Sequence, residues 1–256
     1  KIMQYSNYYD QMNAQGAVFN GTVLLQASAE IGGQKHVYFN LKGAVKEAFR
    51  YPPIGGIITN PFPGPAKIYA GDLVEHSLGF ADNKGGTIKI LKSYAVAKAT
   101  STATDTDIYI VRDGYHHIPF IGDKIMVGQK DFKTKGTGVS VTAVEATTDA
   151  TAGDVWKLTL SAALGALTVG QVLVEAAAVG STLPVVTNPN CFAPHDYDMP
   201  FYTLPGSDEY EKPRMMFTPC LLGPDAVFIK DRMSPLPPAV EAMNISRYPE
   251  LFYTNY

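Results

Sequence analysis

Two adjacent histidines, His116 and His117, are the first residues in this sequence whose chemistry could support a site. Imidazole binds metal ions and transfers protons near neutral pH. The pair follows the turn-forming sequence Arg112-Asp113-Gly114. Because neighbouring residues of an extended segment point to opposite faces, two such imidazoles cannot easily converge on one ion. We therefore expect no metal site at this pair.

A second cluster, His195, Asp196 and Asp198, has ligand-type side chains at short spacing after Pro194. A divalent cation at the surface would accept such a set. A loop of turn residues that hydrogen-bond to nearby amides explains the same pattern, and we expect the loop.

Nucleophiles and paired acids lack the sequence context that catalysis needs. A Gly-x-Ser-x-Gly motif is absent, and so is a glycine-rich phosphate loop. Cys191 and Cys220 stand in no thiol-nucleophile motif, so we expect two reduced thiols, with a bridge between them left open. The acids Asp208-Glu209 and Glu211 are typical of a solvated loop. The sequence therefore predicts no catalytic, cofactor-binding or metal-binding residue, no cofactor and no enzyme.

Aromatic residues raise the alternative of carbohydrate stacking, since the chain has 15 Tyr and 12 Phe. The single tryptophan, Trp156, alternates with Leu158 and Leu160. That period-2 pattern predicts a core position in a strand rather than an exposed platform.

The elements that must position these residues are mainly β-strands. Between residues 67 and 186, β-branched and aromatic runs recur at short spacing with turn residues between them, which suits a small barrel or sandwich. The predicted strands are Leu73 to His76, Thr87 to Val96, Asp107 to Val111, Lys124 to Val127, Gly138 to Val144, Val155 to Ser161 and Gln171 to Glu175. The Ala- and Thr-rich segments Ala97 to Thr106 and Glu145 to Gly153 are predicted to be surface loops.

One short pattern occurs three times in this region, each time before a strand. The copies are Ala70-Gly71-Asp72, Ile121-Gly122-Asp123 and Val169-Gly170-Gln171. Glycine permits a positive φ at the corner, and the Asp or Gln side chain can accept hydrogen bonds from turn amides. The pattern predicts a turn that starts a strand and carries no catalytic weight.

The flanking regions are less regular. Residues 1 to 16 are predicted to form a polar, Tyr-rich arm. Strands are expected at Ala17 to Ser28 and His36 to Leu41, and a short helix is expected over Lys42 to Arg50. The segment Ile54 to Ala66 is expected to be a loop or an edge segment. Prolines punctuate the chain from Thr187 onward, with a strand predicted at Ala226 to Ile229 and a helix at Ala239 to Tyr248.

Composition narrows the possible partners. The formal net charge is −3, only 18% of residues are charged, and the basic residues are scattered, so nucleic acid is not an expected partner. There is no secretory pattern in the first 30 residues and no apolar run of about 20 residues that could span a bilayer, so no membrane association is expected.

The middle third resembles the head fibre and capsid decoration proteins of tailed phages and prophages from Bacteroides-like bacteria. The segments that carry the resemblance are Ile88 to Lys92, Asp107 to Val111, Ile118 to Ile125, Lys135 to Val144, Leu158 to Leu160 and Leu167 to Leu173. They are strand and turn patterns, and the resemblance implies a non-enzymatic virion protein on the capsid exterior, with no site residue to carry over.

We therefore predict a mainly β fold with three regions: residues 1–66 with the arm and first strands, a β-barrel or sandwich at 67–186, and an extended Pro-rich segment at 187–256 packed with the N-terminal region. The predicted function is that of a capsid-bound structural protein. Its partners would be the major capsid protein lattice and further copies of itself, with a trimer favoured. The alternative is a carbohydrate- or receptor-binding β module.

Overall fold

A computed structural model describes residues 17–19, 22–26, 37–42, 56–77, 86–128, 136–194, 196–198, 216–217, 219–223 and 226–254. The chain is mainly β, as predicted. The helical elements in the described part are the 3-10 turn η3 (Lys230–Arg232) and helix α2 (Pro238–Arg247). Helix α2 confirms the predicted C-terminal helix and begins at Pro238, where a missing amide proton costs nothing. No helix among these residues is long and apolar enough to cross a membrane.

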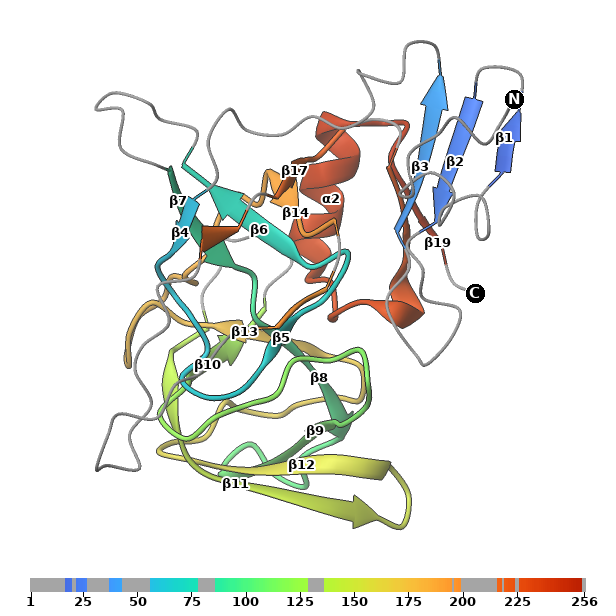
Figure 1. The fold of residues 1–256 in the computed structure, drawn as a ribbon. Coiled ribbons are helices and arrows are strands. Elements are labelled where there is room, and N and C mark those ends of the chain that lie inside the picture. Colours follow the sequence, from blue (N-terminus) through green and yellow to red (C-terminus); the bar gives the residue numbers. More distant parts are fainter. Residues whose placement is uncertain are drawn as a thin grey trace, which may run out of the picture.

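A closed six-stranded barrel forms the lower part of the molecule in Figure 1. Its strands are β8 (Ser93–Lys98), β9 (Asp107–Val111), β10 (Lys124–Val127), β11 (Val139–Asp149), β12 (Gly153–Leu160) and β13 (Val172–Glu175). They pair in the order β10-β11-β12-β9-β8-β13, and β13 closes onto β10. Alternate side chains fill the interior, which holds Tyr94, Val96, Ile108, Ile110, Ile125, Val139, Val141, Leu158, Leu160, Leu167 and Leu173. The predicted barrel is therefore present, over residues 93–175.

The two halves of this barrel are related by a pseudo-twofold axis. The chain order β8, β9, β10 repeats as β11, β12, β13, and a register shift follows Val96 in β8 as it follows Val141 in β11. Equivalent residues face each other at the axis, where Met126 pairs with Val174 and Ile108 with Leu158. The third strand of each half pairs only with strands of the other half. Neither half can form a closed barrel alone.

The three predicted glycine turns share one geometry. Gly71, Gly122 and Gly170 have φ of 88°, 90° and 79°. In each turn the residue after glycine donates its backbone N–H to the carbonyl three residues before it, which gives the type II arrangement. Its side-chain oxygen also accepts the N–H of that same earlier residue, at 2.7 Å for Asp72, 2.8 Å for Asp123 and 3.0 Å for Gln171. The structure confirms the prediction made from this pattern.

A second sheet lies against the barrel and draws on distant parts of the chain. Its order is β16-β4-β7-β6-β14-β17. The strands are β4 (Gly56–Ile58), β6 (Leu73–His76), β7 (Gly86–Ile90), β14 (Cys191–Phe192), β16 (Met216–Phe217) and β17 (Cys220–Leu221). A two-stranded ladder joins β5 (Lys67–Ile68) to β15 (Tyr197–Asp198).

The third sheet pairs N-terminal with C-terminal strands, in the order β1-β2-β3-β18-β19. It contains β1 (Ala17–Phe19), β2 (Thr22–Gln26), β3 (Val37–Lys42), β18 (Ala226–Ile229) and β19 (Phe252–Thr254). Strand β18 agrees with its predicted bounds. The Tyr-rich arm, and all of the predicted first helix except Lys42 of β3, lie outside the described residues.

Several predicted boundaries are wrong, each for a physical reason. The expected strand from Thr87 to Val96 is two strands, because β7 stays in the second sheet while β8 enters the barrel. The expected loop Glu145 to Gly153 is largely strand, because β11 continues to Asp149 against β12 and turns tightly into Gly153, whose φ is 75°.

Two corrections concern the N-terminal region. The segment Ile54 to Ala66 contains β4, which lies between β16 and β7 and is not at a sheet edge. The single strand expected from Ala17 to Ser28 is the hairpin β1–β2. The sequence between these strands is Asn20-Gly21, a strong hairpin signal that favours this outcome.

Candidate functional site

Buried and half-buried polar residues gather where the barrel meets the second sheet. We call this set the polar junction; it comprises Asn60, Asp72, Lys92, Ser93, His117, Glu175 and Ser234. Its members come from the loop after β4, the turn before β6, the junction of β7 and β8, the connection from β9 to β10, the end of β13 and the segment after η3. Six separate stretches of chain therefore converge on it.

His117 lies at the centre of one half of the polar junction. Its Nε2 is 3.0 Å from Asp72 Oδ2 and 3.1 Å from Ser234 Oγ, and the side chains of His117 and Asp72 are fully buried. Its Nδ1 accepts the backbone N–H of Ser93 at 3.2 Å. The Phe62 ring packs beside the imidazole, with 5.3 Å between ring centroids.

These residue types match a Ser-His-Asp catalytic set, but the geometry does not. In such a set the carboxylate and the hydroxyl contact different imidazole nitrogens, whereas Asp72 and Ser234 both contact Nε2. The Ser93 amide can donate only to an unprotonated Nδ1, so the proton of the imidazole is on Nε2. Nε2 then has no lone pair with which to take the Ser234 proton. With its proton on Nε2, His117 ties segments together and does not act as a base toward the Ser234 hydroxyl.

Lys92 lies at the centre of the other half and is only 2% exposed. Its Nζ is 3.1 Å from Glu175 Oε1 and donates to the Pro61 carbonyl at 3.1 Å. The ammonium also stands 4.9 Å from the centroid of the Phe62 ring. Asn60 donates to the second oxygen of Glu175 at 2.6 Å. The buried charge is therefore paired with a carboxylate, bonded to a carbonyl and placed over an aromatic ring.

Asp123 and Tyr94 extend these contacts into the barrel wall. The Tyr94 hydroxyl donates to Asp123 Oδ2 at 3.2 Å, and the Phe120 amide donates to the same oxygen at 2.8 Å. Burial raises the pKa of Asp123 against the opposing effect of Lys92. Burial, and then the charge of Asp123, raises the pKa of Tyr94 well above its usual value.

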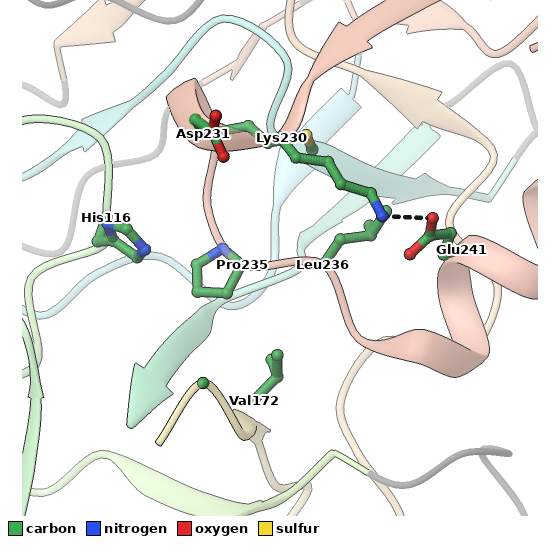
Figure 2. A pocket seen from close by; sticks show the side chains of 9 residues that line it. His116, Val172, Lys230, Asp231, Pro235, Leu236 and Glu241 are labelled. Atoms are coloured by element: carbon green, nitrogen blue, oxygen red, sulfur yellow. Dashed lines mark ion pairs between the residues drawn. The ribbon is translucent and has the colours of Figure 1, made fainter. Parts of the chain in front are cut away.

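A cleft of about 390 Å³ lies between the barrel and the C-terminal segment, as shown in Figure 2. Val172, Met233, Pro235 and Leu236 supply apolar lining. The Lys230 ammonium on its wall is ion-paired with Glu241 at 2.5 Å. His116 also lines the cleft, and its Nδ1 lies 2.7 Å from Asp113.

The two adjacent histidines do not share a site. His116 lies at the cleft and contacts Asp113, whereas His117 is buried against Asp72. Within the described ranges no group of three or more His, Cys, Asp or Glu side chains could hold a metal ion. His195, Asp208, Glu209 and Glu211 lie outside these ranges.

Asp196 serves the turn before β6, because its Oδ1 accepts the Ala70 amide at 2.8 Å. Asp198 belongs to β15, where its backbone pairs with Lys67. The expected hydrogen bond to a backbone amide is present for Asp196, but the amide belongs to a turn 126 residues away and not to its own loop.

No disulfide joins Cys191 and Cys220, although both are buried. Cys191 pairs with Leu221 across β14 and β17, and Phe192 pairs with Cys220. Directly opposed residues share a face and neighbours alternate, so the two thiols point to opposite faces of the sheet. Burial, and then the proximity of Cys220, raises the pKa of Cys191 to about 12, which keeps it a protonated, unreactive thiol.

Trp156 was predicted to be a core residue; it is half-buried and packs against the barrel interior. The Arg112 guanidinium carbon stands 5.2 Å from its ring centroid, so a side chain of the same protein occupies a face of the ring.

Sequence reasoning missed the polar junction, although a signal was present. Lys92 follows the apolar pair Ile90-Leu91, and a lysine there indicates either a strand end or a buried charge. The partners of Lys92, the Pro61 carbonyl and Glu175, lie 31 and 83 residues away in sequence, so only the fold brings them together.

Comparison with models of protein families, with curated proteins and with solved structures found no match for this chain.

Proposed function

We propose that the protein is a non-enzymatic structural component of a tailed bacteriophage, bound to the outside of the capsid as a head fibre or decoration protein. The sequence segments that resemble such proteins are, in the structure, strands β7 to β13 and the turns between them. Its partners are the major capsid protein and further copies of itself, with a trimer favoured.

The observation that carries this proposal is the exposure of Ile121 and Val169, at 66% and 67%. They occupy the same position in two equivalent glycine turns, directly before Gly122 and Gly170. In the third turn the same position is Ala70, which is buried at 3%. A type II turn does not require a β-branched residue there, so contact with another protein is the better reason for an exposed one.

The polar junction supports the same proposal. The imidazole, carboxylate and ammonium groups of His117, Asp72 and Lys92 are committed to buried contacts between segments of the chain. A particle protein needs such internal ties because it must keep its shape while neighbouring subunits bind it.

The carbohydrate-binding alternative needs exposed aromatic faces. Among the aromatic side chains that the structure describes, Phe252 is exposed at 63%, whereas the tyrosines at 69, 94, 109, 115, 197, 248 and 253 are buried or half-buried. Stacking on a sugar requires an open ring, so the surface described here favours protein contact over glycan contact.

Light scattering of the purified protein, followed by co-sedimentation with empty phage heads, tests the proposal. We expect an oligomer that pellets with heads and a double variant, Ile121→Glu with Val169→Glu, that stays in the supernatant. Val179→Glu changes another exposed valine, 57% exposed, and serves as the control that still pellets. A monomer that fails to pellet but binds on a glycan array would transfer the assignment to the carbohydrate-binding alternative.

A further inference from the structure

One strand edge of the barrel is left open. Strand β11 pairs with β12 from Val141 to Asp149, but on its other side β10 covers only Val139 and Ser140. In the described part of the chain, no backbone hydrogen bond reaches the outer edge of residues 143–149. Figure 1 shows the β11–β12 hairpin projecting from the bottom of the barrel, away from the sheets and α2.

The pseudo-twofold axis shows that the barrel does not need this extension. The equivalent hairpin of the other half is β8–β9. Ten residues separate Lys98 from Tyr109 there, whereas fifteen separate the equivalent Ala143 from Thr159. The shorter connection closes as a loop whose amides are bound by Asp105. Only the half that contains β11 and β12 has the longer strands.

The extension lacks the features that protect exposed edges. Residues 143–149 read Ala-Val-Glu-Ala-Thr-Thr-Asp, with no lysine or proline, and the register shift lies before them. Asp149 forms an ion pair with Lys98 at 2.7 Å. Glu145 lies opposite Lys157 across the hairpin, but the Lys157 ammonium forms its ion pair with Asp107, at 2.8 Å. An incoming strand therefore meets Asp149 already ion-paired and Glu145 with only a neighbouring lysine.

We propose that residues 143–149 pair antiparallel with the same segment of a second copy of this chain, about a twofold axis at Ala146. In this register Glu145 lies opposite Thr147, and Ala143 lies opposite Asp149. No like charges meet. A register centred one residue later, on Thr147, would place Glu145 opposite Asp149, and such pairs destabilise a sheet. Registers centred on Val144 or Thr148 avoid like charges too, but they pair less of the segment 143–149 with itself. Ala146 is therefore the register that pairs the whole segment without opposing like charges.

The full-length variants Ala146→Lys and Ala146→Glu test this inference, because each places two like charges opposite each other at the axis. We expect each alone to weaken self-association by about tenfold or more. An equimolar mixture should restore it, since Lys then faces Glu. Ala103→Lys adds the same charge to an exposed position of the equivalent hairpin and is the matched control. Light scattering over a concentration series measures the mass, and circular dichroism checks the fold.

Several results would overturn the inference: a wild-type protein that is monomeric throughout, an Ala146→Lys variant with wild-type mass, or a mixture that stays dissociated. Loss of head co-sedimentation in Ala146→Lys without any change in mass would assign the edge to a capsid strand instead. Self-pairing stands apart from capsid binding and from the favoured trimer, because a twofold contact at Ala146 joins two chains, or two trimers, whether or not the protein pellets with heads.

Discussion

The Nδ1 atom of His117 accepts the backbone N–H of Ser93, the first residue of β8, at 3.2 Å. This bond fixes the imidazole proton on Nε2, which points at Asp72 Oδ2 at 3.0 Å. One side chain therefore joins the entry to the barrel with the turn that starts β6. Ser93 and Asp72 are both buried, so water cannot replace either of them as a partner of His117.

His117→Ala should cost about 3 kcal/mol of folding stability, because it leaves the buried Asp72 carboxylate without its imidazole partner. Urea denaturation followed by circular dichroism measures this change. The neighbouring His116→Ala is the control and should cost less than about 1 kcal/mol, since its partner Asp113 is exposed to water. Equal effects of the two substitutions would contradict a central structural role for His117.

Lys92→Met should destabilise the fold by about 3 kcal/mol, because Glu175 loses its counter-charge in a largely buried position. The double variant Lys92→Met with Glu175→Gln removes both charges and should recover at least half of that loss. Denaturation of the wild type, both single variants and the double variant forms a double-mutant cycle. If the stability loss of the double variant equals the sum of the losses of the two single variants, Lys92 and Glu175 do not stabilise each other.

Gly122→Ala and Gly170→Ala should each lower the folding stability by about 1 kcal/mol. The two losses should be equal, because the glycines occupy equivalent turns of the two barrel halves. An added Cβ meets no atom within 4 Å at either glycine, so the cost comes from the positive φ alone. Gly223→Ala also enters open space but has no positive φ, and it should leave the melting temperature unchanged or slightly raised. Unequal costs at Gly122 and Gly170 would argue against equivalent turns.

Local patterns in the sequence predicted the strands and the glycine turns well. Strands β6, β9 and β10 have the predicted bounds, since short apolar runs and flanking turn residues are local properties. The division between β7 and β8 was not predictable in this way, because Leu91 and Lys92 continue the strand-like pattern while the chain changes sheets.

The polar junction and the open edge depend on contacts that local patterns do not encode. Glu145 to Asp149 read as a loop because Ala and Thr carry no apolar period, yet pairing with β12 makes them a strand. The partners of His117 come from residues 24 to 117 positions away in sequence. Tertiary pairing decided the outcome in both cases.

The folding stability of Glu75→Gln should depend less on pH at acidic pH than that of the wild type. Burial alone would raise the pKa of Glu75, but the amides of Thr187 and Asn188, together with Lys89, outweigh it and lower the pKa below 4.5. The folded state therefore prefers the ionised carboxylate, so its stabilising effect is fully present above pH 4.5 and is lost as the pH falls through the lower, folded-state pKa.

Denaturant midpoints measured from neutral pH to well below pH 4.5 test this sign. Because Glu75 keeps some contact with water, the wild type should lose about 1 kcal/mol or less relative to Glu75→Gln over that range. The side-chain amide oxygen of the substituted glutamine can still accept the Thr187 N–H, so the geometry is retained. Glu250→Gln removes an exposed carboxylate and is the control that should follow the wild type. A wild-type profile parallel to that of Glu75→Gln would show that the Thr187 and Asn188 amides do not stabilise the charge.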